Sequence, residues 1–393
     1  MEFERTDCGI SLRRGGLDAV ERYIASLGLG DAIDRRDDGE RIRLRLAAPS
    51  AAAWMPDFDT LGLSGRLSLD SERSEDLERE ILVALLGSPI DFAYPSADEL
   101  LAAIRMRRRI VEAARRTVLA FDTAAAERPE DHWAYVDGSG FVVRPGKPLI
   151  EALVLATQPG VSGRLYSFSC YRATEYVILL AIAQEAEQVN PPLLAALQQQ
   201  WEERPIMSGR FHDVFLAEFG TNDAPLPPRY YIPGDRLWFR NPDALSSDVS
   251  GFEGSWVFYL GGGLFTNFWK PGRHFTLADK CLEIYHWRHG VRIDAEGEPR
   301  MDEKLVDALV TRSKADPDEA ARIVAQMSRL RDPKGVYADG GCIDATRECP
   351  RAVCPESADI RLPALQRARE AQELDGWAPD PVIHPHPAPT PDT

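Results

Sequence analysis

The sequence has no long apolar run. Its longest uninterrupted apolar stretch is YVILLAIA at residues 176–183, whereas a helix needs about 20 residues to cross a bilayer. Residues 1–16, MEFERTDCGISLRRGG, also lack the order of basic residues followed by an apolar segment that marks a secretory signal. We therefore expect a cytoplasmic protein that does not associate with membranes.

Basic residues are outnumbered by acidic ones. The 393 residues include 46 Lys and Arg against 62 Asp and Glu, a formal net charge of −16 at pH 7. A general nucleic-acid-binding protein needs a basic surface to displace counterions, so nucleic acid is not expected as a partner. One dense basic segment, IRMRRRIVEAARR at residues 104–116, has apolar residues at helical spacing. This pattern predicts the solvated face of an amphipathic helix.

Cysteine is scarce. Six cysteines in a chain of this length do not indicate a disulfide framework, and a cytoplasmic location would keep them reduced. Cys342, Cys349 and Cys354 lie close together in the sequence, but their spacing contains no C-x-x-C. We therefore expect no metal site there.

Several domains fit within this length, and 44% apolar residues indicate a folded protein. Residues 1–80 carry no catalytic pattern and are interpreted as an N-terminal extension. Residues 81–295 place helices before antiparallel strands, which predicts an α+β catalytic domain. We expect a helical C-terminal extension over 296–375 and a disordered, proline-rich tail over 376–393.

Local signals within the predicted catalytic domain are clear. Ser96 followed by Glu99 predicts a capping box at the start of a helix over 97–119. RLWFR at 236–240 predicts a strand, and SWVFYLGGGLF at 255–265 predicts two strands joined by three glycines.

Cys170 directly precedes an apolar, helix-patterned run. Its own helix face carries Thr174 and Val177, so one interpretation is a small hydrophobe in the core. The alternative is a nucleophile, because the N–H groups and the dipole of a helix N-terminus favour a thiolate and predict a lowered pKa. The same N–H groups can hold an oxyanion.

A nucleophilic cysteine needs a proton acceptor. Glu175 is close in sequence but lies about 140° around the helix from Cys170. Glu253 lies in a glycine-flanked turn before an aromatic-rich strand, where partial desolvation would raise its pKa and suit it to accept a proton. A solvated turn residue is the other interpretation. The histidine candidates are His132, His212, His274, His286 and His289.

Four segments, in order, resemble the small bacterial protein-glutamine gamma-glutamyltransferases (transglutaminases) of spore-forming bacteria. They are GSPIDFAYPSADELLAAIRMRRRIVEAA, YSFSCYRATEYVILL, PGDRLWFRNPD and GFEGSWVFYLGGG, covering roughly residues 85–265. The resemblance implies a papain-like, NlpC/P60-like core, in which a cysteine-headed helix packs on an antiparallel sheet.

The resemblance also implies a chemistry. The family nucleophile falls on Cys170 and its partner glutamate on Glu253. A thioester would form on a glutamine side chain with loss of ammonia, and a lysine amine would resolve it into an isopeptide crosslink. The implied partners are proteins with Gln and Lys side chains, and no cofactor is required.

Two positions depart from the family pattern. Ser169 stands where the family often has an acidic residue, and LFTNFW replaces a segment that contains a histidine. Asn267 is therefore at best an approximate, orienting substitute. Aromatic side chains would either shield a thioester from water or form the core of the sheet: Tyr231, Trp238, Phe252, Trp256, Phe265 and Trp269.

Two other functions stay open. A cysteine amidase or peptidase of the NlpC/P60 type would use water in place of lysine, and such enzymes pair cysteine with histidine, which makes His274 a further candidate for an orienting role. A non-catalytic binding module on the same scaffold would bury Cys170 without a polar neighbour. The sequence does not indicate an oligomeric state.

Overall fold

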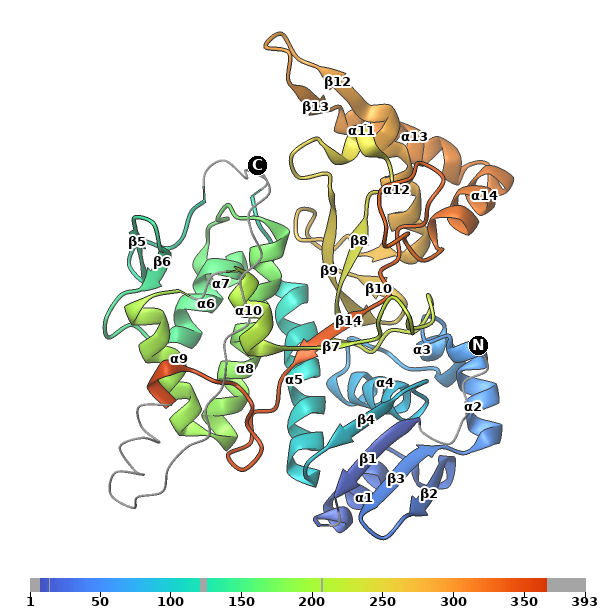
Figure 1. Ribbon diagram of the computed structural model, residues 1–393, viewed down its shortest axis with the longest axis vertical. Coiled ribbons are helices and arrows are strands. Elements are labelled where there is room, and N and C mark those ends of the chain that lie inside the picture. The colour runs from blue at the N-terminus through green and yellow to red at the C-terminus, as the bar shows by residue number, and fades with distance from the viewer. Residues whose placement is uncertain (1–7, 14, 121–125, 206–207, 366–393) are drawn as a thin grey trace.

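The computed structural model describes residues 8–13, 15–120, 126–205 and 208–365. The proline-rich segment 376–393 lies outside these residues. In Figure 1 the N-terminal elements (blue), a group of helices (green) and the C-terminal elements (orange) surround the long helix α5. Among the described residues, no helix is long and apolar enough to cross a membrane.

The N-terminal elements form a four-stranded sheet of order β2-β3-β1-β4, in which β1 pairs antiparallel with β3 and parallel with β4. Ile10 and Leu12 of β1 are buried, as alternation in a strand requires. The boundary expected at residue 80, between the N-terminal extension and the catalytic domain, stays a prediction. Strand β4 lies beyond that residue and still belongs to this sheet. The elements are β1 (Gly9–Arg13), α1 (Leu17–Ser26), η2 (Gly30–Ala32), β2 (Ile33–Asp37), β3 (Arg41–Leu46), α2 (Ala48–Trp54), η3 (Pro56–Phe58), α3 (Leu63–Leu67), α4 (Ser74–Leu86) and β4 (Asp91–Tyr94).

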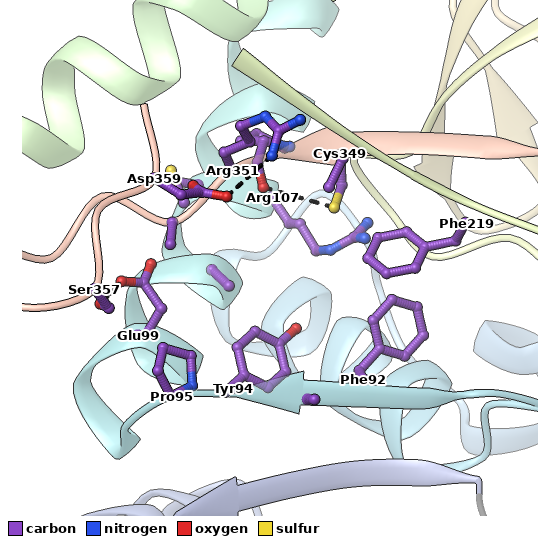
Figure 2. A pocket seen from close by; sticks show the side chains of 16 residues that line it. Phe92, Tyr94, Pro95, Glu99, Arg107, Phe219, Cys349, Arg351, Ser357 and Asp359 are labelled. Atoms are coloured by element: carbon purple, nitrogen blue, oxygen red, sulfur yellow. Dashed lines mark hydrogen bonds and ion pairs between the residues drawn. The ribbon is translucent and has the colours of Figure 1, made fainter. Parts of the chain in front are cut away.

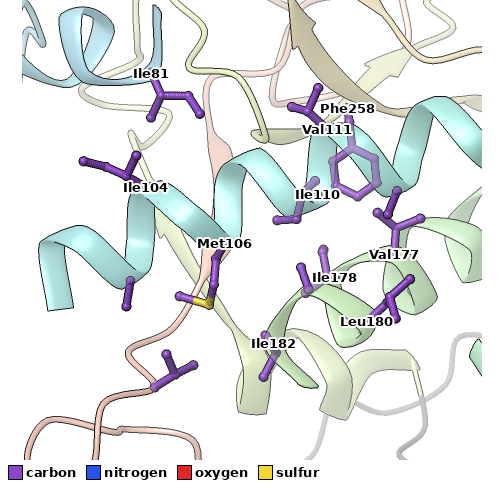
Figure 3. Close-up of a cluster of buried hydrophobic side chains, with 14 of the residues drawn as sticks. Ile81, Ile104, Met106, Ile110, Val111, Val177, Ile178, Leu180, Ile182 and Phe258 are labelled. Carbon is purple, nitrogen blue, oxygen red and sulfur yellow. The ribbon is translucent and has the colours of Figure 1, made fainter. Parts of the chain in front are cut away.

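Two long helices, α5 (Ala97–Arg116) and α8 (Cys170–Val189), form the centre of the larger core with α4 and strand β9 (Gly254–Gly261). Figure 3 shows Ile110 of α5 next to Ile178 of α8, with Phe258 of β9 above them, while Ile104 lies on the opposite side of α5, toward α4. All four side chains are fully buried. Because α8 is apolar on almost every side from residue 173 to 183, it is a buried helix.

Around α8 lie a hairpin and four further helices, drawn in green in Figure 1. They are β5 (Trp133–Val136), β6 (Gly140–Val143), α6 (Leu149–Thr157), α7 (Pro159–Ser162), α9 (Pro191–Glu203) and α10 (Ser208–Phe215). The buried residues of α6 and α9 are mostly apolar, so these two helices cover α8.

The central sheet has six antiparallel strands in the order β11-β10-β9-β8-β14-β7. The strands predicted over 236–240 and 255–265 are confirmed as β8, β9 and β10. Gly261, Gly262 and Gly263 all have a positive φ, which explains the three glycines of the connection. The remaining strands are β7 (Leu216–Phe219), β8 (Arg236–Arg240), β10 (Leu264–Phe265), β11 (Phe275–Thr276) and β14 (Arg347–Pro350).

The C-terminal elements pack against this sheet. Together with side chains of the sheet, they form a second hydrophobic core. Besides helices, the segment 296–365 contributes β14, which lies within the sheet between β8 and β7. The elements not yet described are α11 (Ala244–Ser247), α12 (Leu277–Gly290), β12 (Val291–Ile293), β13 (Pro299–Met301), α13 (Glu303–Lys314) and α14 (Pro317–Met327).

Helix α5 begins where predicted, but its predicted capping box is only half formed. The Ser96 hydroxyl accepts a hydrogen bond from the Glu99 N–H at 3.1 Å. The Glu99 carboxylate instead accepts from the backbone N–H groups of Val353 and Cys354, both at 3.0 Å. A tertiary contact has therefore taken the place of the reciprocal cap.

The basic segment on α5 is not a solvated face, so that prediction is wrong. Arg107 is 2% exposed, and its Nη1 lies 2.7 Å from Asp235 Oδ1. Arg105 and Arg109 both bind the buried carboxylate of Glu185, at 2.6 and 3.1 Å. Buried carboxylates on other elements make burial of these arginines possible.

Candidate active site

Cys170 opens into a cavity of about 580 Å³ at the N-terminal end of α8. The walls come from the start of α8, the turn before β9, the loop after β10 and helix α12. The residues discussed below that line it are Ser169, Cys170, Tyr171, Trp238, Phe252, Glu253, Ser255, Trp256, Asn267, Phe268, Trp269, Lys270, Phe275, Lys280, Glu283, Trp287 and Glu303.

Cys170 is the first residue of α8, and it is partly exposed. Ser169 is the N-cap, and its hydroxyl accepts a hydrogen bond from the Arg172 N–H at 3.3 Å. A serine at this position satisfies one of the helix's unpaired donors. The sequence thus fixes the helix start so that the thiol lies at the edge of the cavity.

The pKa of the Cys170 thiol is raised, chiefly because burial disfavours the thiolate. Hydrogen bonds from the backbone of Trp256 and Tyr171 lower the pKa, as do the charges of Lys280 and Arg236, but by less. The expectation of a lowered pKa is therefore wrong for the resting site, because desolvation outweighs the helix terminus. The thiol needs a base to remove its proton.

Glu253 stands immediately before β9 and lines the same cavity as Cys170. Its carboxylate is exposed and accepts from the Gly251 N–H at 3.2 and 3.1 Å. Its carbonyl accepts from the Asn241 N–H at 3.0 Å, which ties the turn to β8. The structure thus brings the predicted nucleophile and the predicted base to one cavity.

The two orienting candidates lie in different places. Asn267 lines the cavity, and its Oδ1 accepts from the N–H groups of Trp269 and Lys270 at 3.1 and 3.2 Å. Among the described residues that line the cavity there is no histidine, and the pKa of His274 is lowered by burial and by the charge of Arg115.

Sequence reasoning missed a buried lysine at this site. Lys280 is 3% exposed, and its Nζ lies 2.7 Å from Glu283 Oε2 and 3.4 Å from Ser255 Oγ. The ammonium also lies 3.7 Å from the centroid of the Phe275 ring. The i,i+3 spacing of Lys280 and Glu283 fits many surface pairs, so only the packing of α12 shows that Lys280 is buried.

Arg236, fully buried on β8, supports the cavity from behind. Its guanidinium lies 4.0 Å from the Trp256 ring centroid and 4.6 Å from that of Tyr171. Its Nε donates to Thr174 Oγ1 at 2.8 Å, and Nη1 lies 2.5 Å from Glu348 Oε2. One cation therefore joins α8, β9 and β14 next to Cys170.

Some of the six aromatic residues named from the sequence belong to the core of the sheet, and the others are placed where they can shield a thioester. Tyr231 and Phe265 are fully buried core residues. The other four line the cavity together with four rings that were not predicted: Trp238, Phe252, Trp256 and Trp269, joined by Tyr171, Phe268, Phe275 and Trp287. The Trp238 and Trp256 rings stack with centroids 5.8 Å apart, which gives the cavity an apolar wall.

The family model described as protein-glutamine gamma-glutamyltransferase matches residues 63–361. The chain belongs to this family. The match extends on both sides of the region from which the resemblance was predicted. Within the described residues, no group of three or more His, Cys, Asp and Glu side chains could hold a metal ion.

Two individual proteins of the transglutaminase family are similar to this chain. A protein-glutamine gamma-glutamyltransferase of Halalkalibacterium halodurans is 26% identical over 219 residues, which cover 53% of this chain and 69% of that protein. A solved transglutaminase of Geobacillus stearothermophilus, without its C-terminal extension, is 20% identical with a TM-score of 0.36. The match covers 55% of this chain and 98% of the solved chain.

Family membership confirms the predicted acyl transfer through a cysteine. It does not favour the amidase or the non-catalytic module. The α+β fold, with a cysteine-headed helix packed against an antiparallel sheet, is also confirmed.

Proposed function

We propose that this transglutaminase uses Cys170 as its nucleophile and Glu253 as its general base and acid. The observation that carries this proposal is that both side chains line one cavity at the N-terminus of α8. Because burial raises the pKa of the thiol, attack requires a base, and Glu253 is a carboxylate at the same cavity.

In the first half-reaction, the Cys170 sulfur attacks the carboxamide carbon of a substrate glutamine while Glu253 takes the thiol proton. The tetrahedral intermediate then collapses to a thioester, and Glu253 returns that proton to the leaving ammonia. The backbone N–H groups of Trp256 and Tyr171, whose hydrogen bonds lower the pKa of the thiol, would stabilise the thiolate before attack and would then hold the oxyanion of the intermediate.

In the second half-reaction, a lysine amine attacks the thioester. Glu253 accepts a proton from this amine and passes it to the departing sulfur, so that an isopeptide bond forms and the Cys170 thiol is restored. Glu303 also lines the cavity, and its charge suits a cationic acceptor. The aromatic wall limits the access of water, which would otherwise hydrolyse the thioester.

We propose Asn267 as a positioning residue. Its Oδ1 fixes the loop that carries Trp269, so Asn267 would set the shape of the cavity wall against which the acyl group binds. His274 has no part in this mechanism.

The test is incorporation of a fluorescent primary amine into casein by the full-length protein. Cys170→Ala and Glu253→Gln should each abolish incorporation, while His274→Ala should leave it nearly unchanged. Full activity in Glu253→Gln would refute the assignment of the base. Ammonia release without amine incorporation would show that water is the acceptor.

We further propose that the substrates are proteins bearing Gln and Lys side chains, encountered in the cytoplasm. Membership of the transglutaminase family supports protein substrates with Gln and Lys side chains. The free cysteines support the cytoplasmic location, because a reducing compartment keeps a partly exposed thiol such as Cys170 in the form that the mechanism needs.

A further inference from the structure

A second pocket lies between the N-terminal sheet and the central sheet. It encloses about 270 Å³ and is lined by β4, α5, β7, β14 and the segment that follows β14. Figure 2 shows Phe92 and Tyr94 on β4 below it, with Arg107 and Cys349 above. None of its lining residues lines the cavity of Cys170, so it is a separate site.

Arg107 extends across this pocket toward Phe219 (Figure 2) and is 2% exposed. Its Nη1 donates to Asp235 Oδ1 at 2.7 Å and to the Pro233 carbonyl at 3.3 Å. Its Nη2 is buried and has no hydrogen-bond partner among the described residues. A buried charged donor without an acceptor is costly and rare in native proteins.

The anionic groups nearby are engaged elsewhere. The Glu99 carboxylate accepts from two backbone N–H groups and from the Ser357 hydroxyl. Asp359 pairs with Arg351 at 3.1 Å. Burial raises the pKa of Cys349 to about 11, although the charge of Arg107 and a hydrogen bond with its guanidinium lower it. The thiol is therefore a neutral contact of Arg107 and not its counter-ion.

The rest of the pocket is suited to a flat apolar group. The rings of Phe92 and Phe219 lie with centroids 4.6 Å apart and inclined at 55°. The Tyr94 hydroxyl points into the pocket (Figure 2), and burial raises its pKa, so it stays protonated and can donate. Pockets of this kind, mostly apolar with a few converging polar groups, bind small molecules.

We propose that this pocket binds a small aromatic carboxylate. The carboxylate would accept hydrogen bonds from Arg107 Nη2 and the Tyr94 hydroxyl, and the ring would lie against Phe92 and Phe219. A carboxylate is favoured over a neutral acceptor because hydrogen bonds between two charged groups are the stronger ones.

The test is calorimetric titration of phenylacetate into the full-length Cys170→Ala protein, which keeps the pocket but excludes binding as an acyl-enzyme. We expect saturable binding, with phenylacetamide at least tenfold weaker. Tyr94→Phe should weaken binding several-fold. Ala217→Leu, which fills the pocket from β7, should abolish it, whereas Ala52→Leu, exposed on α2, should have no effect.

Circular dichroism and thermal unfolding of each variant establish that it is folded. Equal binding of phenylacetamide, unchanged binding by folded Ala217→Leu, or no saturable binding at millimolar phenylacetate would each overturn the proposal. Because the titration uses an inactive variant, its result is independent of the amine-incorporation assay that tests the proposed function.

Discussion

Lys280 and Arg236 are the buried cations that act on the Cys170 thiol. Each forms an ion pair with a carboxylate, Lys280 with Glu283 and Arg236 with Glu348. Buried charges are retained only where such partners exist. At the residue scale, the site therefore depends on cations that lie far from Cys170 in the sequence.

We expect Lys280→Met to slow the reaction of Cys170 with iodoacetamide at pH 7.5 by up to about tenfold, since one pKa unit changes the thiolate fraction tenfold. The ammonium lowers the thiol pKa, so its loss raises that pKa further. The measurement is the alkylation rate as a function of pH. Lys270→Met is the matched control, because Lys270 lines the same cavity but is half exposed. Equal slowing in both variants would contradict the prediction.

The buried carboxyl group of Glu175 should make the free energy of unfolding depend on pH. Burial raises its pKa to about 7, against the lowering effect of Arg172 and Arg236. The folded state therefore binds this proton more tightly than the unfolded state, and stability falls as the pH rises from about 4.5 to 7. Relative to the unmodified protein, Glu175→Gln should gain about 3 kcal/mol in unfolding free energy between pH 4 and pH 8.

Urea unfolding at several pH values measures this difference. The control is Glu187→Gln, exposed on the same helix, which should keep the pH dependence of the unmodified protein. A Glu175→Gln difference that does not change with pH would show that the carboxyl is not the group responsible.

The sequence could not predict which charges are buried. Arg107 and Lys280 occur in patterns typical of exposed helix faces, and their burial depends on where other elements pack. Asp235, for example, is 128 residues from Arg107. The position of Cys170 at a helix start was predictable, because its cap and its apolar run are local.

At the scale of elements, the glycine connection between β9 and β10 is fixed by a buried carboxylate. Glu80 of α4 accepts from the Gly262 N–H at 3.0 Å, from the Ser64 hydroxyl at 2.7 Å and from the Tyr259 hydroxyl at 3.2 Å. The glycines predicted a turn, but no local pattern indicated that α4 would hold it.

Gly261→Ala should destabilise the protein by about 1–3 kcal/mol. Gly261 has φ +81°, and a Cβ there would lie 2.6 Å from Glu80 Oε2. Thermal or urea unfolding measures the loss. The control is Gly160→Ala on α7, where φ is not positive and a Cβ would meet no atom within 4 Å. A loss no larger than that of the control would mean that the turn relaxes without strain.

At the scale of the whole molecule, β14 joins parts of the chain that are distant in the sequence. It lies between β8 and β7, and its Glu348 binds Arg236 of β8 and His212 of α10, the latter at 2.9 Å. The short segment Arg347–Pro350 has no strong strand pattern of its own, so its place in the sheet was not predictable. The residues expected to form a C-terminal extension thus complete the central sheet.

Glu348→Ala should therefore cost about 3–5 kcal/mol of stability, because it leaves the Arg236 guanidinium buried without its partner. Glu348→Leu combined with Arg236→Met should recover much of that loss, since it removes both charges and keeps the volume. Urea unfolding of the two variants measures the difference. If the double variant were as unstable as Glu348→Ala, the loss would come from repacking of β14 rather than from the unpaired charge. The double variant should still lose amine incorporation, because Arg236 contacts Tyr171 and Trp256 beside Cys170.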